Sequence, residues 1–177
     1  MSSCSLFCLH TTAHCVQPKE IPVTKVAVNF TGYADQSYAH KRNVIEVVIH
    51  QAYAEPGRPS MINDIAMFFL DSPVTTEITP IQLNTEVGVP TDGQVLKAIG
   101  LGAVDGNGIY YPYDLMEVDL PKVNDESCKG SYYYSYVKVN TKTTVCAGGE
   151  QGKDTCSGDS GNQHTSTIAT TKPFSFV

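Results

Sequence analysis

Short runs of β-branched and other apolar residues recur along the sequence, and residues that favour turns separate them. The clearest runs cover residues 23–30, 43–50, 62–70, 93–100 and 115–120. β-Branched residues favour an extended backbone, whereas Gly, Pro, Asn and Asp favour turns. Many short strands in this arrangement predict an all-β barrel or sandwich without helices of ordinary length. One short helical turn is predicted over residues 124–129.

The composition is that of a globular protein. Of the 177 residues, 41% are hydrophobic and 17% are charged, and the net charge is −6. A chain of this length can form one domain with a sizeable core. A negative net charge argues against a nucleic-acid partner, which requires a basic face. Since no apolar stretch has the length of a membrane span, we expect a soluble domain with no membrane partner.

Two further features indicate secretion. Cys128 and Cys146 enclose a loop rich in Tyr, Ser and Lys, which predicts a surface loop closed by a disulfide. Closing a loop of this size would stabilise the fold by about 3 kcal/mol. Asn29-Phe30-Thr31 is a glycosylation sequon, so we predict a secreted glycoprotein. No signal peptide is visible, because the start of the chain has no positive charge and only a short apolar stretch.

The last stretch, residues 162–177, differs from the rest of the chain. Thr and Ser are frequent in it, and its few apolar residues lie mostly at its end. This composition predicts a tail that has no partner strand.

Three short segments contain, in chain order, His14, Asp64 and Ser160. Their sequences are Thr-Ala-His-Cys, Asn-Asp-Ile-Ala and Gly-Asp-Ser-Gly. Each alone has an ordinary interpretation as a surface histidine, a solvated aspartate or a turn. Together they supply what an activated serine needs, because a base must take the hydroxyl proton and an anion must orient that base. The order His, Asp, Ser is one of several in which such groups occur.

From about Thr11 to Gly161 the chain resembles the trypsin-like members of the chymotrypsin family. Further similar segments cover residues 48–53, 63–70, 115–121, 146–148 and 156–161. The resemblance implies an all-β fold, an incomplete double six-stranded antiparallel β-barrel. Residues 1–161 would form a partial trypsin-like peptidase domain, and residues 162–177 a tail that does not match the family.

The resemblance also assigns roles to the candidate site residues. His14 would be the general base, Asp64 its orienting carboxylate and Ser160 the nucleophile. The backbone N–H groups of Gly158 and Ser160 would form the oxyanion hole. Asp154 matches the carboxylate at the base of the primary specificity pocket of trypsins, where it would select Lys or Arg. The alternative for Asp154 is a solvated residue in a polar loop.

By the same resemblance, Cys128 and Cys146 form a disulfide and Cys15 pairs with Cys4 or Cys8. Cys156 has no cysteine after it in the chain, so it would lack its usual partner.

A metal site is an alternative interpretation of the first cysteines and histidines. Cys4, Cys8, His10, His14 and Cys15 are zinc-ligand types, but their spacing fits no common structural zinc site. We therefore expect no metal and no cofactor.

The chain also departs from the family pattern. The Ile-Val-Gly-Gly start and the Ser-Trp-Gly segment of the family are missing, and the chain contains no Trp. In active relatives the freed N-terminal ammonium pairs with the carboxylate at the position of Asp159. We therefore expect a domain truncated at both ends, with a zymogen-like site.

Two tyrosine clusters, residues 110–113 and 132–136, remain open between ordinary loop surface and an aromatic rim for a partner. The resemblance implies a secreted, monomeric serine endopeptidase that cleaves protein or peptide substrates, after Lys or Arg if Asp154 is the pocket carboxylate. The alternative is a non-catalytic protease homologue that acts as a protein-binding or inhibitor protein.

Overall fold

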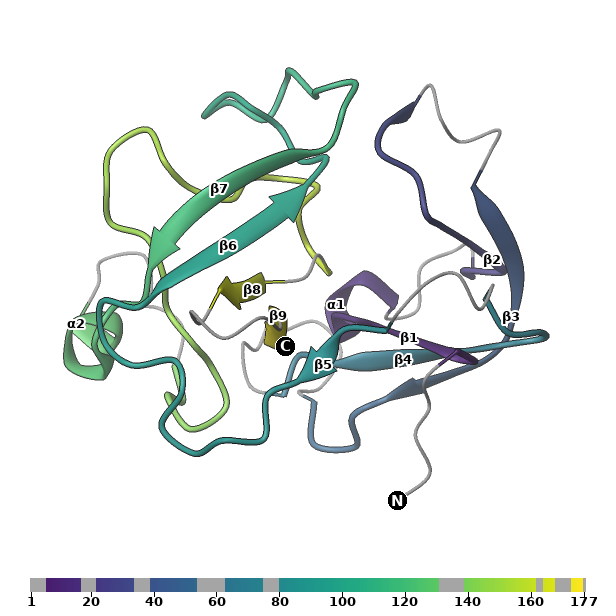
Figure 1. Cartoon of the computed structure of the whole chain (residues 1–177), viewed down its shortest axis with the longest axis horizontal. Helices are drawn as coiled ribbons and strands as arrows, with labels where there is room; N and C mark the ends of the chain where they lie inside the picture. The colour runs from purple at the N-terminus through teal and green to yellow at the C-terminus, as the bar shows by residue number, and fades with distance from the viewer. Residues whose placement is uncertain are drawn as a thin grey trace.

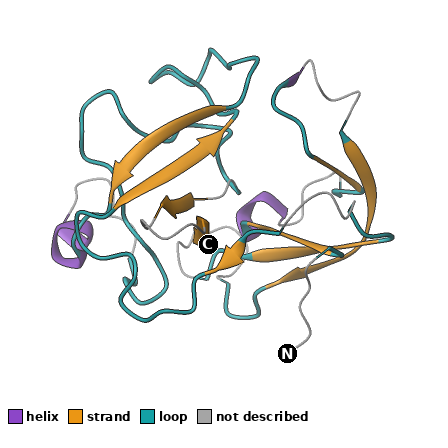
Figure 2. Ribbon diagram, viewed as in Figure 1, coloured by secondary structure: helices purple, strands orange, loops and turns teal. Residues whose placement is uncertain are grey.

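The computed structural model describes residues 6–16, 22–33, 39–53, 63–74, 80–130 and 139–161, and the backbone of residues 164–167 and 173–176. Its strands are β1 (Cys8–Thr11), β2 (Lys25–Val28), β3 (His40–Ile49), β4 (Ala66–Leu70), β5 (Gln82–Leu83), β6 (Val95–Gly100), β7 (Met116–Pro121), β8 (His164–Thr167) and β9 (Pro173–Phe176). Its helices are α1 (Ala13–Val16) and α2 (Asp125–Gly130). The predicted all-β class is confirmed, since strands far outweigh helices (Figure 2).

The first sheet has the order β1-β4-β3-β2, and every neighbouring pair in it is antiparallel (Figure 1). Burial alternates along β4, so that Phe68 and Leu70 lie in the core while the residues between them are only partly buried. Phe68, Leu70 and Val74 form the centre of this core. The alternation follows from the two-residue repeat of a strand, which sends successive side chains to opposite faces.

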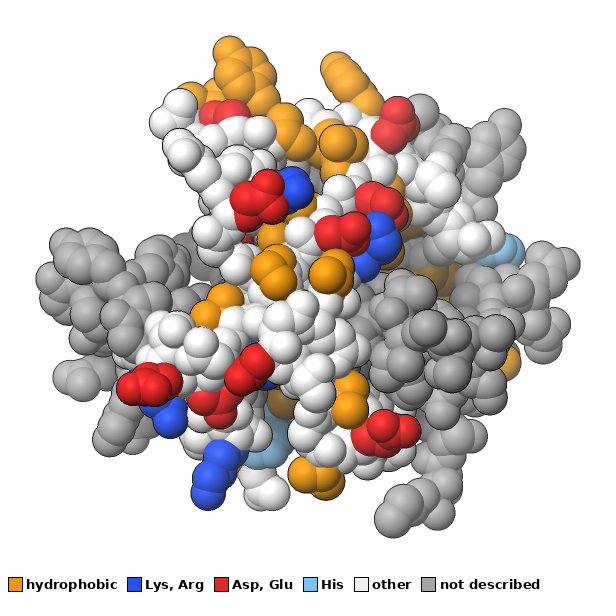
Figure 3. Space-filling view, turned by 60° about the vertical axis from the view of Figure 1, so that its left-hand side comes forward, with side chains coloured by type: hydrophobic (Ala, Val, Ile, Leu, Met, Phe, Trp, Pro, Cys, Tyr) orange, Lys and Arg blue, Asp and Glu red, His pale blue; other side chains and the backbone are white. Residues whose placement is uncertain are grey.

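The second sheet has the order β5-β9-β8-β6-β7, with one parallel pair between β5 and β9. Its best-paired strands are β6 and β7, in which Leu96 lies opposite Leu120. Each of these leucine side chains is only 2% exposed. On the outer side of these strands Lys97 pairs with Glu117 and Asp119, and acidic and basic side chains adjoin on this side of the molecule (Figure 3).

The prediction of an unpaired tail is wrong for part of residues 162–177. β8 pairs with β6, and β9 pairs with both β8 and β5. An open strand edge carries N–H and C=O groups that any suitable strand can satisfy, and the Thr-rich composition of β8 suits an extended backbone. The open edge of β6 therefore pairs with β8, although the apolar pattern of residues 162–177 does not predict a strand there.

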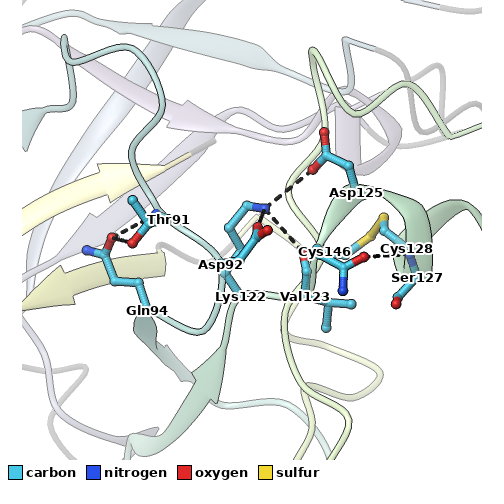
Figure 4. Close-up of polar contacts among 10 residues, drawn as sticks. Thr91, Asp92, Gln94, Lys122, Val123, Asp125, Ser127, Cys128 and Cys146 are labelled. Carbon is cyan, nitrogen blue, oxygen red and sulfur yellow. Dashed lines mark hydrogen bonds and ion pairs between the residues drawn. A yellow bond between two sulfur atoms is a disulfide. The ribbon is translucent and has the colours of Figure 1, made fainter.

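The predicted helical turn and the predicted disulfide are both confirmed. The Asn124 side chain accepts the N–H of Ser127 at 2.8 Å and so caps the start of α2. Cys128 of α2 is bonded to Cys146, with their Cα atoms 5.9 Å apart (Figure 4). Beside this disulfide the Lys122 ammonium bridges Asp92 and Asp125, which ties the end of β7 to the loop before β6 and to α2 (Figure 4).

A backbone contact joins the segment after β2 to the segment just before β7. Gly32 forms a bridge with Asp114, and the Tyr33 N–H donates to the Tyr113 carbonyl at 2.9 Å. A β-carbon on Gly32 would lie 2.6 Å from that carbonyl oxygen, so this approach requires glycine.

Candidate active site

His14 lies on α1, a single helical turn that follows β1 directly. The Cys15 N–H donates to the Thr12 carbonyl at 3.2 Å, which closes the turn. Ala13 is fully buried and anchors the turn, whereas the His14 side chain is 44% exposed. The small buried residue thus holds the backbone while the next side chain reaches the surface.

Asp64 lies on a tight turn just before β4. Asn63 has a φ of 55°, in the left-handed region, which Asn tolerates better than most residues. The Asn63 side-chain amide donates to the Ala52 carbonyl at 3.2 Å, and the Ile65 N–H donates to the Asn63 carbonyl at 2.8 Å. These bonds fix the backbone on both sides of Asp64.

The structure brings His14 and Asp64 into direct contact. The antiparallel pairing of β1 with β4 places Thr11 opposite Ala66, which sets the two segments side by side. Asp64 accepts the His14 N–H on Oδ1 at 2.9 Å, and its Oδ2 lies 2.6 Å from His14 Nδ1. A carboxylate only accepts hydrogen bonds, so Nδ1 carries a proton and Nε2 of the neutral ring remains an acceptor.

Ser160 lies on a turn that is stabilised by hydrogen bonds to the side chain of the preceding residue, Asp159. The Asp159 N–H donates to the Cys156 carbonyl at 3.0 Å. The two carboxylate oxygens of Asp159 accept the N–H groups of Gly102, at 2.8 Å, and of Cys156, at 2.9 Å. The carboxylate therefore ties the turn to the segment that follows β6.

The turn that carries Ser160 packs against the junction of β1 and α1. The Cys15 sulfur lies 3.7 Å from the Ser160 carbonyl oxygen. A β-carbon on Gly161 would lie 2.7 Å from the Thr11 hydroxyl, so glycine permits this approach. Within the described residues no hydrogen bond joins Ser160 to His14. The structure thus places Ser160 on a segment adjacent to His14 without a direct bond.

Two backbone N–H groups of the same turn, those of Gly158 and Ser160, are candidate donors to a substrate. Gly158 has a φ of 97°, a conformation that favours glycine. In the described part of the chain, neither the Gly158 nor the Ser160 N–H donates to an acceptor. Both are therefore available to a negatively charged oxygen.

Asp154 lines a cavity of about 840 Å³. Segments that follow β6 and precede the Ser160 turn form the walls of this cavity, together with part of β7. Asp154 is exposed, and its carboxylate accepts the N–H of Thr155 at 2.8 Å. Neighbouring Lys153 pairs with Glu150 at 2.9 Å rather than with Asp154.

The expected pairing of Cys15 with Cys4 or Cys8 is wrong. Cys15 is a free thiol, whereas Cys8 takes part in a disulfide. The physical reason is that Cys15 lies on α1 with its sulfur turned toward the Thr12 hydroxyl, at 3.1 Å, and the Ser160 turn. Cys4 lies outside the described residues. Cys156 is free as predicted, and its sulfur lies 3.5 Å from the Asp105 carbonyl oxygen.

Sequence reasoning missed several residues beside the site. Tyr53 is one, because burial, and then the charge of Asp64, raise the pKa of its hydroxyl. Gly102 is another, since a β-carbon there would overlap the Asp159 carboxylate. Tyr111 is a third, and its ring contacts Gly158. Tyr111 belongs to the tyrosine cluster at 110–113, which the sequence left open between ordinary loop surface and an aromatic rim. The cluster at 132–136 lies outside the described residues.

In the described ranges no three His, Cys, Asp or Glu side chains are arranged to hold a metal ion. None of the helices in those ranges is long and apolar enough to cross a membrane.

Residues 5–162 match the Trypsin family. The chain is 34% identical to Trypsin zeta of Drosophila melanogaster over 158 residues, which cover 85% of this chain and 54% of that protein. It is 38% identical to the vitellin-degrading protease of Bombyx mori over 108 residues, or 58% of this chain and 39% of that protein. The chain thus spans about half the length of the trypsin it matches.

The fold has a counterpart among solved structures. Neuropsin, a serine protease of mouse brain, superposes with a TM-score of 0.76 at 23% identity, over 97% of this chain and 76% of that chain. This likeness shows the trypsin-like fold. With the family match over most of its length, the chain belongs to the trypsin family of chymotrypsin-like serine proteases.

Proposed function

We propose that this chain carries the catalytic site of a secreted serine endopeptidase, with His14 as general base, Asp64 as its orienting carboxylate and Ser160 as nucleophile. In this reaction the Ser160 hydroxyl oxygen attacks the carbonyl of a peptide bond while His14 Nε2 takes its proton. The protonated ring then gives that proton to the leaving amine, and water later releases the acyl group from Ser160.

The contact between His14 and Asp64 carries the proposal. Two hydrogen bonds, from the His14 backbone and from Nδ1, hold the carboxylate in one orientation. A base that is held in this way has its proton on Nδ1, so Nε2 is ready to accept another. The carboxylate also stabilises the positive charge that the ring acquires during the reaction.

The Ser160 turn supports the proposal through its backbone donors. The Gly158 and Ser160 N–H groups, without acceptors among the described residues, would bind the oxyanion that forms on the attacked carbonyl. The Asp159 side chain holds the turn that presents these groups. The absence of a bond between Ser160 and His14 is compatible with catalysis, because such bonds often tighten only when substrate is bound.

We further propose that Asp154 selects Lys or Arg before the cleaved bond. The carboxylate lines the cavity next to the Ser160 turn, where a cationic side chain could reach it. The substrates would then be proteins or peptides with basic residues at the cleaved position.

The test is hydrolysis of an arginine thioester by the 177-residue chain, compared with the variants Ser160→Ala and Asp154→Asn. We expect turnover that Ser160→Ala abolishes, and a preference for Arg over Phe thioesters that Asp154→Asn removes. Turnover that persists in Ser160→Ala would contradict the assignment of the nucleophile. A correctly folded chain with no turnover, and no covalent labelling of Ser160 by a fluorophosphonate, would contradict the catalytic function.

A further inference from the structure

Of the two residues of the proposed oxyanion hole, Gly158 has the greater freedom in its backbone φ angle. Glycine visits positive and negative φ about equally, so its own backbone does not fix the direction of its N–H. Hydrogen bonds hold Asp159 and Cys156, and a single one holds the Gly158 peptide group: the Ser157 carbonyl, which shares that group with the Gly158 N–H, accepts the Ala103 N–H at 2.8 Å. Packing on Gly158 therefore adds to this one bond in setting how often the Gly158 N–H has the direction that catalysis needs.

The ring of Tyr111 packs on Gly158. At the position that a β-carbon of Gly158 would occupy, Tyr111 Cε1 lies 3.2 Å away and Cδ1 3.8 Å away. The Cα of Gly102 lies 3.3 Å from the same point. The glycine thus lies between an aromatic ring and a backbone segment, and Tyr111 is 48% exposed.

The loop before Tyr111 is held in place by the carboxylate of Asp105. It accepts the N–H groups of Asn107 at 3.1 Å, Ile109 at 2.9 Å and Tyr110 at 2.7 Å. The Val104 N–H also donates to the Tyr110 carbonyl at 2.9 Å, which closes the base of the loop. Three N–H bonds to one carboxylate make this a defined loop, and Tyr111 follows it directly.

The same loop is tied to the Ser160 turn at its other end. The Ala103 N–H donates to the Ser157 carbonyl at 2.8 Å, and the Cys156 sulfur lies 3.5 Å from the Asp105 carbonyl oxygen. Both contacts involve the two residues that directly precede Gly158. The position of the Tyr111 ring is therefore fixed relative to the turn it covers.

We propose that Tyr111 is a positioning residue for the oxyanion hole: its ring, held by the loop that Asp105 organises, packs on Gly158 and keeps the N–H of that residue directed at the substrate carbonyl. This inference rests on the proposed catalytic function of the site. Tyr111 acts through Gly158 and contacts no reacting atom. Its ring, not its hydroxyl, provides the effect, because ring carbons are the atoms that lie against Gly158.

The experiment compares Tyr111→Ala and Tyr111→Phe with Tyr113→Ala in the 177-residue chain. Tyr113 lies two residues away and is 82% exposed, so Tyr113→Ala removes the same kind of side chain from the same loop. Two quantities are measured: kcat and KM on the arginine thioester, and the amide hydrogen exchange of the segment that contains Gly158.

For Tyr111→Ala we expect kcat to fall about tenfold while KM stays within about twofold. This loss in kcat is smaller than the loss expected when an oxyanion-hole donor is removed altogether. Exchange in the Gly158 segment should become faster. Tyr111→Phe should restore both values, and Tyr113→Ala should leave them unchanged. A KM effect with unchanged kcat would instead make Tyr111 a substrate contact and would overturn the proposal.

The exchange measurement separates this proposal from the proposed function. If the chain has no turnover, faster exchange in Tyr111→Ala but not in Tyr113→Ala still supports the packing of the ring on Gly158. If Tyr111→Ala and Tyr113→Ala exchange alike, the positioning role is wrong, whether or not the chain is active.

Discussion

His14 and Asp64 are 50 residues apart in the sequence, yet both oxygens of the Asp64 carboxylate contact His14, at 2.9 Å from its backbone N and 2.6 Å from Nδ1. The backbone bond fixes the carboxylate even when the ring moves. Because the carboxylate accepts a hydrogen bond from Nδ1, the proton of the neutral ring lies on Nδ1 and Nε2 can accept the serine proton.

Asp64→Asn should leave the fold intact but remove most activity. The amide can donate to Nδ1, which favours a proton on Nε2 and leaves the wrong nitrogen facing the serine. We expect kcat to fall by about four orders of magnitude in a Ser-His-Asp site of this kind. The measurement is thioester turnover beside a thermal unfolding curve. A loss of less than about tenfold would show that Asp64 does not orient His14 in the reaction.

Gly102→Ala should disturb the Ser160 turn, because the added β-carbon would overlap the Asp159 carboxylate that holds this turn. Overpacking of this kind lowers the free energy of unfolding by about 1–3 kcal/mol. Gly106→Ala is the matched control, since no atom lies within 4 Å of a β-carbon there. Urea unfolding of the two variants provides the comparison, and equal midpoints would show that Asp159 moves aside without cost.

Removal of the Cys128–Cys146 disulfide should lower the free energy of unfolding by about 3 kcal/mol, because the bond closes a loop across a sequence separation of 18. The double variant Cys128→Ala and Cys146→Ala tests this by urea unfolding. Cys156→Ala removes a thiol that forms no disulfide and is the control. A double variant as stable as this control would show that the loop contributes nothing to stability.

Acid should weaken the loop before Tyr111. The N–H of Tyr110 is the main cause that lowers the pKa of the Asp105 carboxyl from its ordinary value of 3.8, and the Ile109 and Asn107 N–H groups act in the same direction. A carboxyl whose pKa is lower in the folded state stabilises the fold fully above its unfolded pKa. That contribution is lost as the pH falls below 3.8 and through the folded pKa.

The measurement is the midpoint of thermal unfolding between pH 7 and pH 2, for the native chain and for Asp105→Asn. Asp71 and Asp125 also have lowered pKa values, so both proteins should lose stability in acid. The native chain should lose more, because only it has the Asp105 carboxylate to protonate. Parallel curves would mean that this carboxylate does not stabilise the loop.

Much of the fold could be predicted from short stretches of sequence. The β-branched runs correspond to β2, β3, β4, β6 and β7, and the predicted turn corresponds to α2. The boundaries shift by a few residues, as for β4, which begins at Ala66 rather than at residue 62. These elements depend on the preferences of neighbouring residues, so a local pattern is enough to find them.

Part of the site could be found in the same way. The segments around His14, Asp64 and Ser160 stand out because each carries a reactive group in a distinctive setting of small and turn-forming residues. The contact of His14 with Asp64 is the relationship that these segments led us to expect. The roles of Ser160, Gly158 and Asp154 stay predictions until the kinetic tests are made.

What the sequence by itself determined is therefore the strand content, the disulfide of Cys128 and the identity of the reactive segments. Only the tertiary structure decided that β8 fills the edge of β6, that Cys15 faces the Ser160 turn as a free thiol, and that Tyr111 covers Gly158. The physical reason is distance along the chain. Strand preference acts between neighbours, whereas an open edge or a packed ring finds its partner only after distant segments have been brought together.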